Sequence, residues 1–273
     1  MKKNKSILLS IPYILWMLVF TLIPLGVVGY YALTDPETGI FTWGNIRELW
    51  MFAPTLGISV WYSLVSALIC LLLGYPVAYY IAHRGETAQK ILYMLVMLPM
   101  CMSFLLRTLA WVGLLETNGI INQALNALGI RSLNMIGTPG AVILGMVYNY
   151  LPYMILPLYA IIVKIDSRLI EAAEDLGCTP VQVFSKVILP LSMPGILSGI
   201  TMVFVPAVST FYISQKLGGT DTMLIGDVIE RQFKSAGNPN LGAALSLVLM
   251  LLVFVCTGIM NRFGSDEEGG VVV

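Results

Sequence analysis

The chain has 273 residues, of which 58% are hydrophobic and 11% are charged, whereas soluble domains average about half apolar and about a quarter charged residues. This composition excludes an ordinary soluble domain and predicts an all-α membrane protein built as one bundle of spanning helices. Lys and Arg total 15, as do Asp and Glu, so the net charge is zero and no excess of basic charge is available to bind nucleic acid through its phosphates.

Six stretches are long and apolar enough to cross a membrane, which needs about 20 largely apolar residues. We therefore expect a single six-helix transmembrane domain over residues 1–264, followed by a short acidic tail at 265–273. The expected spans are residues 8–32, 57–82, 90–113, 139–163, 191–213 and 241–261.

The first span follows Lys2, Lys3 and Lys5, an arrangement that also begins a signal peptide. Its apolar run is much longer than the usual run of about 7 to 15 residues, and it lacks a small-x-small cleavage site. We therefore interpret it as a retained helix.

Between Ile91 and Leu115, in the third span, the only charged residue is Arg107. At about 1.5 Å per residue, Arg107 would lie roughly 24 Å along a straight helix. That position is near the outer interface, where the side chain can snorkel to water or pair with Glu116.

Lys and Arg accumulate in short cytoplasmic loops. With the N-terminus inside, nine of the 15 basic residues fall in inner segments, five in outer segments and one, Arg107, within a span. This distribution predicts a cell-membrane protein whose two termini are both cytoplasmic, with the segment 164–190 on the cytoplasmic side.

Several chemistries are excluded by missing residues. No GxxxxGK[ST] motif occurs, so the chain cannot cradle nucleotide phosphates in a P-loop. His83 is the only histidine, which excludes HExxH and multi-histidine metal sites. No expected span has a carboxylate near its middle, where ion-coupled pumps usually need one. We expect no catalytic residue, no metal and no cofactor bound by this chain.

The inner segment 164–190 is too long for a simple turn, and its pattern predicts two short helices. Asp166 or Ser167 can cap the first helix, and Gly177 suits the left-handed residue that ends it. Thr179 and Gln182 form a capping-box pattern at the start of the second. Apolar stripes are expected at Leu169, Ile170, Ala173 and Leu176 on the first helix and at Val181, Phe184 and Ile188 on the second.

The small pair Ala172 and Ala173 would let the first helix sit closely in a groove of another protein, with Glu171 and Glu174 at the rim of that groove. The alternative is a surface helix that only connects two spans.

The segment resembles the EAA loop of ABC importer permeases. The shared string is Glu171-Ala172-Ala173, three residues, Gly177, nine residues, Val187, one residue and Leu189-Pro190, with Val in place of the usual Ile. The resemblance implies the type I permease fold, with this loop as the coupling helix that docks into a cytoplasmic ATPase. The implied coupling residues are Glu171, Ala172, Ala173, Gly177, Leu189 and Pro190.

Further strings over residues 98–246 resemble the spermidine/putrescine permease subfamily. They are Leu106–Trp111, Gly119–Asn122, Tyr150–Tyr159, Val203–Ala207, Leu217–Gly219 and Gly242–Ser246. The first 90 residues share mainly hydropathy with it. The resemblance implies a polyamine solute. It also implies three kinds of partner in the membrane complex: a second homologous permease, two copies of an ATPase that bind ATP and Mg, and an extracytoplasmic solute-binding protein.

A polyamine path needs hydrogen-bond acceptors and aromatic faces. On the span 191–213, four such residues fall within an arc of roughly 80° at about 100° per residue, and the span 139–163 adds two tyrosines near Asn149. These path candidates are Tyr150, Tyr153, Ser198, Thr201, Ser209 and Tyr212. The alternative is that they only pack helices together.

Other functions remain open at this point. Arg107 could serve as a counter-charge in an importer for an anion or a metal complex. A channel or carrier that acts alone, or an intramembrane enzyme, would need no ATPase.

Overall fold

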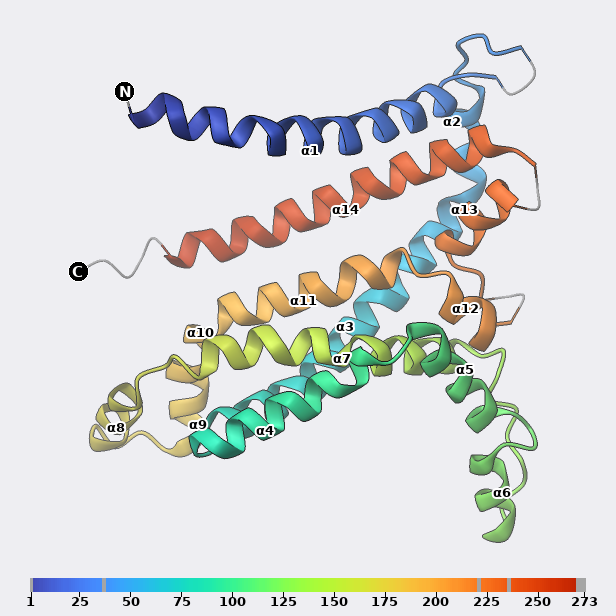
Figure 1. Ribbon diagram of the computed structural model, residues 1–273. Helices are drawn as coiled ribbons and strands as arrows, with labels where there is room; N and C mark the ends of the chain where they lie inside the picture. The colour runs from blue at the N-terminus through green and yellow to red at the C-terminus, as the bar shows by residue number, and fades with distance from the viewer. Residues whose placement is uncertain (1, 36–37, 220–221, 235–236, 269–273) are drawn as a thin grey trace. The chain divides into compact units, whose positions relative to one another are not determined.

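The computed structural model describes residues 2–35, 38–219, 222–234 and 237–268. Most of the expected acidic tail lies outside these residues or has undescribed side chains. The described helices are α1 (Lys2–Ala32), α2 (Gly44–Glu48), η1 (Leu49–Phe52), α3 (Ala53–Ala82), α4 (Glu86–Met97), η2 (Leu98–Cys101), α5 (Phe104–Leu115), α6 (Ile120–Ala127), α7 (Pro139–Ile162), α8 (Ser167–Asp175), α9 (Pro180–Val183), η3 (Phe184–Ile188), α10 (Leu189–Leu191), α11 (Met193–Val208), α12 (Tyr212–Leu217), α13 (Ile225–Lys234) and α14 (Pro239–Glu268) (Figure 1).

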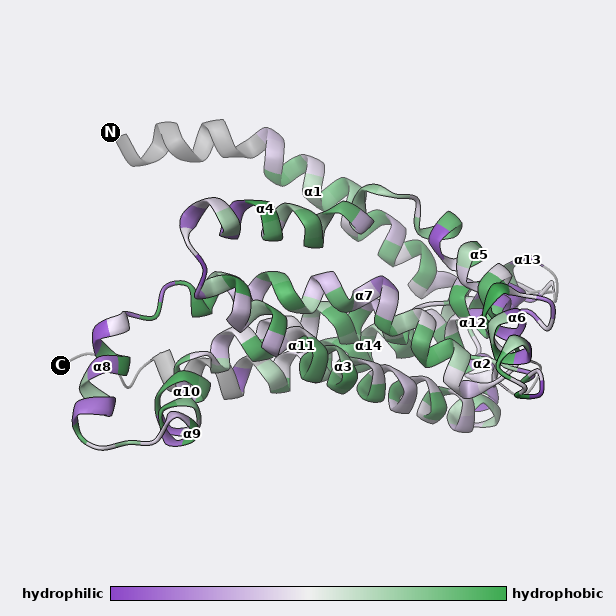
Figure 2. Cartoon of the chain, turned by 90° about the horizontal axis from the view of Figure 1, so that it is seen from below, coloured by the Kyte–Doolittle hydropathy of each residue, from purple (hydrophilic) through white to green (hydrophobic). Residues whose placement is uncertain are grey.

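The expected all-α membrane fold is confirmed. Within the described residues, extended backbone pairs only in an isolated bridge between Thr34 and Phe41. Five helical segments are long and apolar enough to span a membrane, and a bent pair makes a sixth. Figure 2 shows hydrophobic residues along α3, α7 and α11 and hydrophilic residues gathered on α8. The segments are Pro12–Ala32, Gly44–Ala82, Phe104–Ala127, Pro139–Ile162 and Pro239–Met260, and the pair is Pro180–Leu191 with Met193–Val208.

The prediction of one helix over residues 90–113 is wrong. Helix α4 passes into the 3₁₀ turn η2, Met102 is extended with ψ 148°, and α5 starts afresh at Phe104. Pro99 lies in η2, where it has no N–H to continue the α-helical ladder. Hydropathy measures only the length of an apolar run, so it could not detect this break.

The predicted span 191–213 also differs from the structure at both ends. It is bent by 64° where Pro180–Leu191 meets Met193–Val208. Helix α11 ends at Val208, and α12 begins separately at Tyr212. Residues on either side of this break therefore do not share one helix face.

The contacts divide the chain into two compact units, residues 1–54 with 228–252 and residues 55–227 with 253–273. In the first unit, Ala32 packs on Ala243 and Ala244. The Asn240 side chain donates to the carbonyl of Thr34 at 2.6 Å, and Asn45 donates to the same carbonyl at 2.9 Å. These two amides satisfy the carbonyl of Thr34, two residues beyond the end of α1.

Helix α7 is the centre of the second unit, and most of its length is buried. It packs most extensively against α11, and the two helices run side by side in both views (Figures 1 and 2). Gly195 and Gly199 allow this approach, because a Cβ at Gly199 would lie 2.6 Å from Met154 Sδ and one at Gly195 would lie 3.1 Å from Ile161 Cγ1. Small residues at such contacts are typical of membrane helices.

The segment after α11 folds back onto this bundle, although the sequence predicted an outer loop from residue 214 onward. Ile213, Leu217 and Leu224 are completely buried. Asp227 is only 3% exposed, and its carboxylate accepts from the backbone N–H of Leu224 at 2.9 Å. Helix α12 is therefore part of the core and not a surface loop.

The packing of α12 on α7 makes a testable prediction at Gly145. A Cβ there would lie 2.5 Å from Leu217 Cδ1 and 2.9 Å from Ile213 Cγ2, whereas a Cβ at Gly57 on α3 meets nothing within 4 Å. We expect Gly145→Val to lower the melting temperature of the detergent-purified protein, since overpacking typically costs about 1 to 3 kcal/mol. Gly57→Val is the matched control, and equal melting temperatures for the two variants would contradict the packing described.

Candidate functional site

The segment 164–190, between α7 and α11, begins with the predicted helix, α8. The Asp166 carboxylate accepts from the N–H of Arg168 at 3.0 Å, which caps the helix. Gly177 has φ +83° and follows the helix end, and the N–H of Cys178 reaches the carbonyl of Ala173 at 3.1 Å. The predicted cap and left-handed glycine are both confirmed.

The second helix, α9, starts with the predicted capping box. The Thr179 hydroxyl accepts from the N–H of Gln182 at 3.4 Å, and the Gln182 side chain accepts from the N–H of Thr179 at 2.9 Å. The chain then widens into a π-helical turn, η3, in which the N–H of Leu189 bonds the carbonyl of Phe184. Such turns often occur at functional sites.

Leu189 and Pro190 form the corner between this turn and α11. The corner is fixed to α3 by Ser192, whose buried hydroxyl lies 2.8 Å from the hydroxyl of Tyr75. Phe184 stacks edge-on against Tyr75 at 5.5 Å and against Tyr79 at 6.3 Å. Sequence reasoning missed both tyrosines, although their four-residue spacing with His83 at the end of a span was a usable signal.

The predicted apolar stripes are only half right. Ala173, Val183 and Ile188 form a small buried cluster inside the loop. Leu176 and Val181, assigned to the same stripes, are 85% and 75% exposed. A nine-residue helix covered on one side by one short turn can bury only a narrow face, so the rest of its apolar residues point outward.

The two alanines of the predicted pair differ in exposure. Ala173 is 9% exposed and packs within the loop itself. Ala172, Glu171 and Glu174 are exposed. We define the outer face of the loop as the exposed residues Leu169, Glu171, Ala172, Glu174, Leu176 and Val181.

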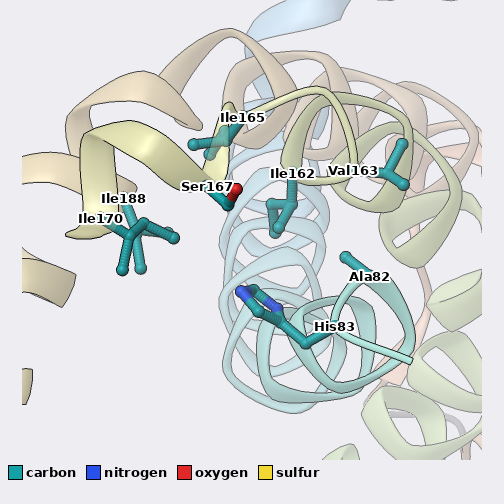
Figure 3. Close-up of a pocket in the computed structure, with 8 residues that line it drawn as sticks. All are labelled: Ala82, His83, Ile162, Val163, Ile165, Ser167, Ile170 and Ile188. Carbon is teal, nitrogen blue, oxygen red and sulfur yellow. The ribbon is translucent and has the colours of Figure 1, made fainter. Parts of the chain in front are cut away.

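A pocket of about 150 Å³ lies where the ends of α3 and α7 meet the loop (Figure 3). Its polar lining residues are His83 and Ser167. His83 Nδ1 lies 2.9 Å from the carbonyl of Tyr79, and the two rings stack at 4.1 Å. The other lining residues are aliphatic: Ala82, Ile162, Val163, Ile165, Ile170 and Ile188. This lining is typical of a packing gap beneath α8.

A second cluster is aromatic and lies where α5, α7 and α12 meet. The ring of Phe104 lies 6.5 Å from that of Tyr150 and 6.3 Å from that of Tyr212, and Tyr150 lies 6.3 Å from Tyr153. We call Phe104, Tyr150, Tyr153 and Tyr212 the aromatic cluster. The structure thus brings together three of the six predicted path residues through a phenylalanine that sequence reasoning missed.

The members of the aromatic cluster differ in exposure. Tyr150 is 7% exposed and its hydroxyl donates to the carbonyl of Pro206 at 3.3 Å. Tyr153 is 36% exposed. The ammonium of Lys216 lies 5.8 Å from the centre of the Tyr212 ring, within the range of a cation–π contact. One ring of the aromatic cluster is therefore already in contact with a cationic side chain of the protein itself.

The predicted hydroxyl stripe does not hold as one face. Ser198 and Thr201 lie on α11, Ser209 follows its end and Tyr212 belongs to α12. The hydroxyl of Thr201 donates to the carbonyl of Leu197 at 2.8 Å, and that of Ser209 donates to Val205 at 3.2 Å. These two hydroxyls are thus bonded to their own chain.

Arg107 neither extends into solvent nor pairs with Glu116, the two arrangements that the sequence predicted. It is 6% exposed, its Nε and Nη1 atoms have no hydrogen-bond partner among the described residues, and it forms no ion pair with Glu116. It interacts electrostatically with Tyr150, the twelfth of 24 residues in α7. The break at Met102 redirects α5, so distance along a straight helix could not give its depth.

The comparisons identify the family. The family described as the binding-protein-dependent transport system inner membrane component matches residues 71–266. The chain belongs to this family. The spermidine/putrescine permease PotB of Haemophilus influenzae is 40% identical over 253 residues, covering 88% of each chain. PotB of Escherichia coli is 36% identical over 247 residues, 87% of this chain and 90% of that one.

Solved structures share the fold. A bacterial ABC transporter that imports alginate has a TM-score of 0.76 at 18% identity, covering 97% of this permease and 96% of that chain. The MetNI methionine transporter has a TM-score of 0.61 at 19% identity, covering 81% and 98%. The chain is the permease subunit of an ABC importer, and the family implied by the EAA-like loop is confirmed.

The buried position of Ala173 makes a prediction about the loop. Ala173→Trp should break the internal cluster with Val183 and Ile188 because no space exists there for an indole. We expect several-fold faster tryptic cleavage at the exposed Lys186 in the purified permease. Ala172→Trp places the same side chain on the outer face and should leave cleavage unchanged; equal rates for both variants would show that the loop is not held by this cluster.

Proposed function

We propose that the permease imports polyamines such as spermidine and putrescine and forms half of the translocation path. The observation that carries this proposal is the 40% identity to a spermidine/putrescine permease over 88% of the chain. The aromatic cluster supports it, because ring faces attract ammonium groups by about 0.5 to 2 kcal/mol each without trapping them. Tyr153 is the exposed member that a passing solute can reach.

The proposed complex contains a second homologous permease, two copies of a cytoplasmic ATPase and an extracytoplasmic solute-binding protein. A solved relative of the same fold is an alginate transporter in complex with a periplasmic protein bound to an alginate pentasaccharide. The sequence has no P-loop, so ATP and Mg would bind the ATPase, and this chain would act as a transport subunit with no cofactor of its own.

We place the ATPase contact on the outer face of the loop. Leu176 and Val181 are largely exposed apolar side chains, and Glu171 and Glu174 flank them with negative charge. Ala173 and Gly177 shape the loop from within, and Leu189 and Pro190 form its corner. ATP binding would move the docked loop with the ATPase, and the bend before α11 would pass this movement to the spans.

The proposed orientation puts both termini and the loop in the cytoplasm. Its support is the bias of nine inner to five outer basic residues. The loop lies at the same ends of α3 and α7 as His83 and Lys164, the inner ends in this orientation.

A second candidate is an importer for an anion or a metal complex. The observation in its favour is Arg107, whose buried guanidinium has two nitrogens without partners. An anionic solute would satisfy them, whereas a polyamine would not.

The docking proposal predicts a change at Leu176. Leu176→Asp should leave the purified permease folded, because the side chain is 85% exposed, yet it should reduce co-purification of the ATPase several-fold by placing a charge in an apolar contact. Leu128→Asp, at a position 76% exposed on another segment, is the control. Undiminished ATPase recovery with Leu176→Asp would exclude this face as the docking surface.

The substrate proposal predicts a loss of uptake at the aromatic cluster. Tyr153→Leu and Tyr212→Leu keep apolar bulk but remove the electron-rich ring, so spermidine uptake into cells should fall several-fold at equal expression. Tyr13→Leu, 66% exposed on α1, should leave uptake unchanged. Normal spermidine uptake in both cluster variants would count against a path along these rings.

A further inference from the structure

Arg107 is a buried charged side chain, and two of its three guanidinium nitrogens have no hydrogen-bond partner among the described residues. The residue is 94% buried, and the two nitrogens are Nε and Nη1. Burying an unpaired charge in a bilayer is costly, and an ionisable residue at that depth marks a functional site by default. Helix packing alone therefore does not explain a buried arginine at this position.

The side chain faces into the bundle and not toward lipid. The large exposed side chains of α5 are Leu105, Leu106 and Leu109. At about 100° per residue, they lie roughly 100° to 160° around the helix from Arg107. Helix α5 contacts α12 and α7.

Arg107 also lies beside the aromatic cluster. It is one helical turn from Phe104 and interacts electrostatically with Tyr150. Tyr150 occupies the middle of α7, about 17 Å of helical rise from its first residue. Figure 1 shows α5 beginning beside α7, beyond the end of α4. The positive charge therefore lies near the aromatic cluster.

Aromatic faces attract every cation, including small ones. A path lined by the rings of Tyr150, Tyr153 and Tyr212 would favour Na⁺ and K⁺ as well as a polyamine. A fixed positive charge at the same level opposes this attraction, since electrostatic barriers of this kind exclude cations and protons from pores. Among the described residues, no carboxylate forms a salt bridge with Arg107.

We propose that Arg107 is a specificity-determining residue that keeps the path impermeable to protons and small cations. The proposal rests on the proposed path through the aromatic cluster. In this state of the permease, the guanidinium raises the energy of any lone cation beside Tyr150. A polyamine would pass only when ATP-driven movement of the spans separates α5 from the rings.

The test measures passive leak through the assembled importer. The complete complex of both permeases and the ATPase is reconstituted in liposomes with a trapped pH dye, without ATP and without polyamine, and a valinomycin-imposed potential drives protons inward. We expect Arg107→Gln and Arg107→Met to raise proton influx about tenfold or more above wild type. Arg107→Lys should stay tight because it keeps the charge. Arg84→Gln, which removes an exposed guanidinium stacked 4.1 Å from the Tyr80 ring, is the control and should also stay tight.

Uptake of radiolabelled spermidine by the same liposomes, now with ATP and the solute-binding protein, separates the two proposals. Faster proton influx in Arg107→Gln and Arg107→Met than in wild type supports the barrier, whether or not the wild type carries spermidine. If Arg107→Gln and Arg107→Met show no more proton influx than wild type and still import spermidine, Arg107 is not a barrier to cations, and the proposed function stands. Tight neutral variants that lose all transport, with Arg107→Lys still active, would overturn both and identify Arg107 as the counter-charge for an anion.

Discussion

The close contact between α7 and α11 determines where the functional parts of this permease lie. Lipid provides little hydrophobic force between helices, so their association depends on packing and on small residues that allow a close approach. Gly195 and Gly199 give α11 that approach, because a side chain at Gly199 would collide with Met154 and one at Gly195 would crowd Ile161. The loop that connects the two helices must then fold at one of their ends, and α12 must return to the bundle at the other.

The loop is a small folded unit whose stability comes from within. Ala173, Val183 and Ile188 bury one another, and Phe184 joins this cluster to Tyr75 and Tyr79 on α3. Rigid attachment matters for a coupling element, because a force applied to its outer face reaches the spans only if the loop does not deform. The π-helical turn and the corner at Leu189 and Pro190 provide that connection to α11.

The part of the second unit formed by α5, α7 and α12 combines aromatic rings with charges in an apolar setting. Phe104 brings Tyr150 and Tyr212 together, while Lys216 lies over one ring and Arg107 interacts electrostatically with another. A cation would be attracted by the rings and repelled by these two side chains. The balance between them depends on helix positions, so a modest movement of α5 or α12 would change it.

The sequence by itself determined the features that depend on local chemistry. Run length and apolar composition predicted the spans, since a bilayer requires about 20 such residues wherever they fold. The cap at Asp166, the left-handed Gly177 and the box between Thr179 and Gln182 were predicted because each depends on residues within a few positions of one another. The EAA-like spacing predicted the family for the same reason.

Only the tertiary structure decided which faces are covered. Leu176 and Ala173 belong to one predicted stripe, yet one is exposed and the other buried, because the turn that packs on α8 comes from later in the chain. Arg107 was placed by counting along a straight helix, but the break at Met102 interrupts that helix, and the side chain is buried. Tyr212 joins the aromatic cluster because it lies on α12, which is separate from α11. Exposure and depth depend on contacts between distant segments, and no local pattern specifies those contacts.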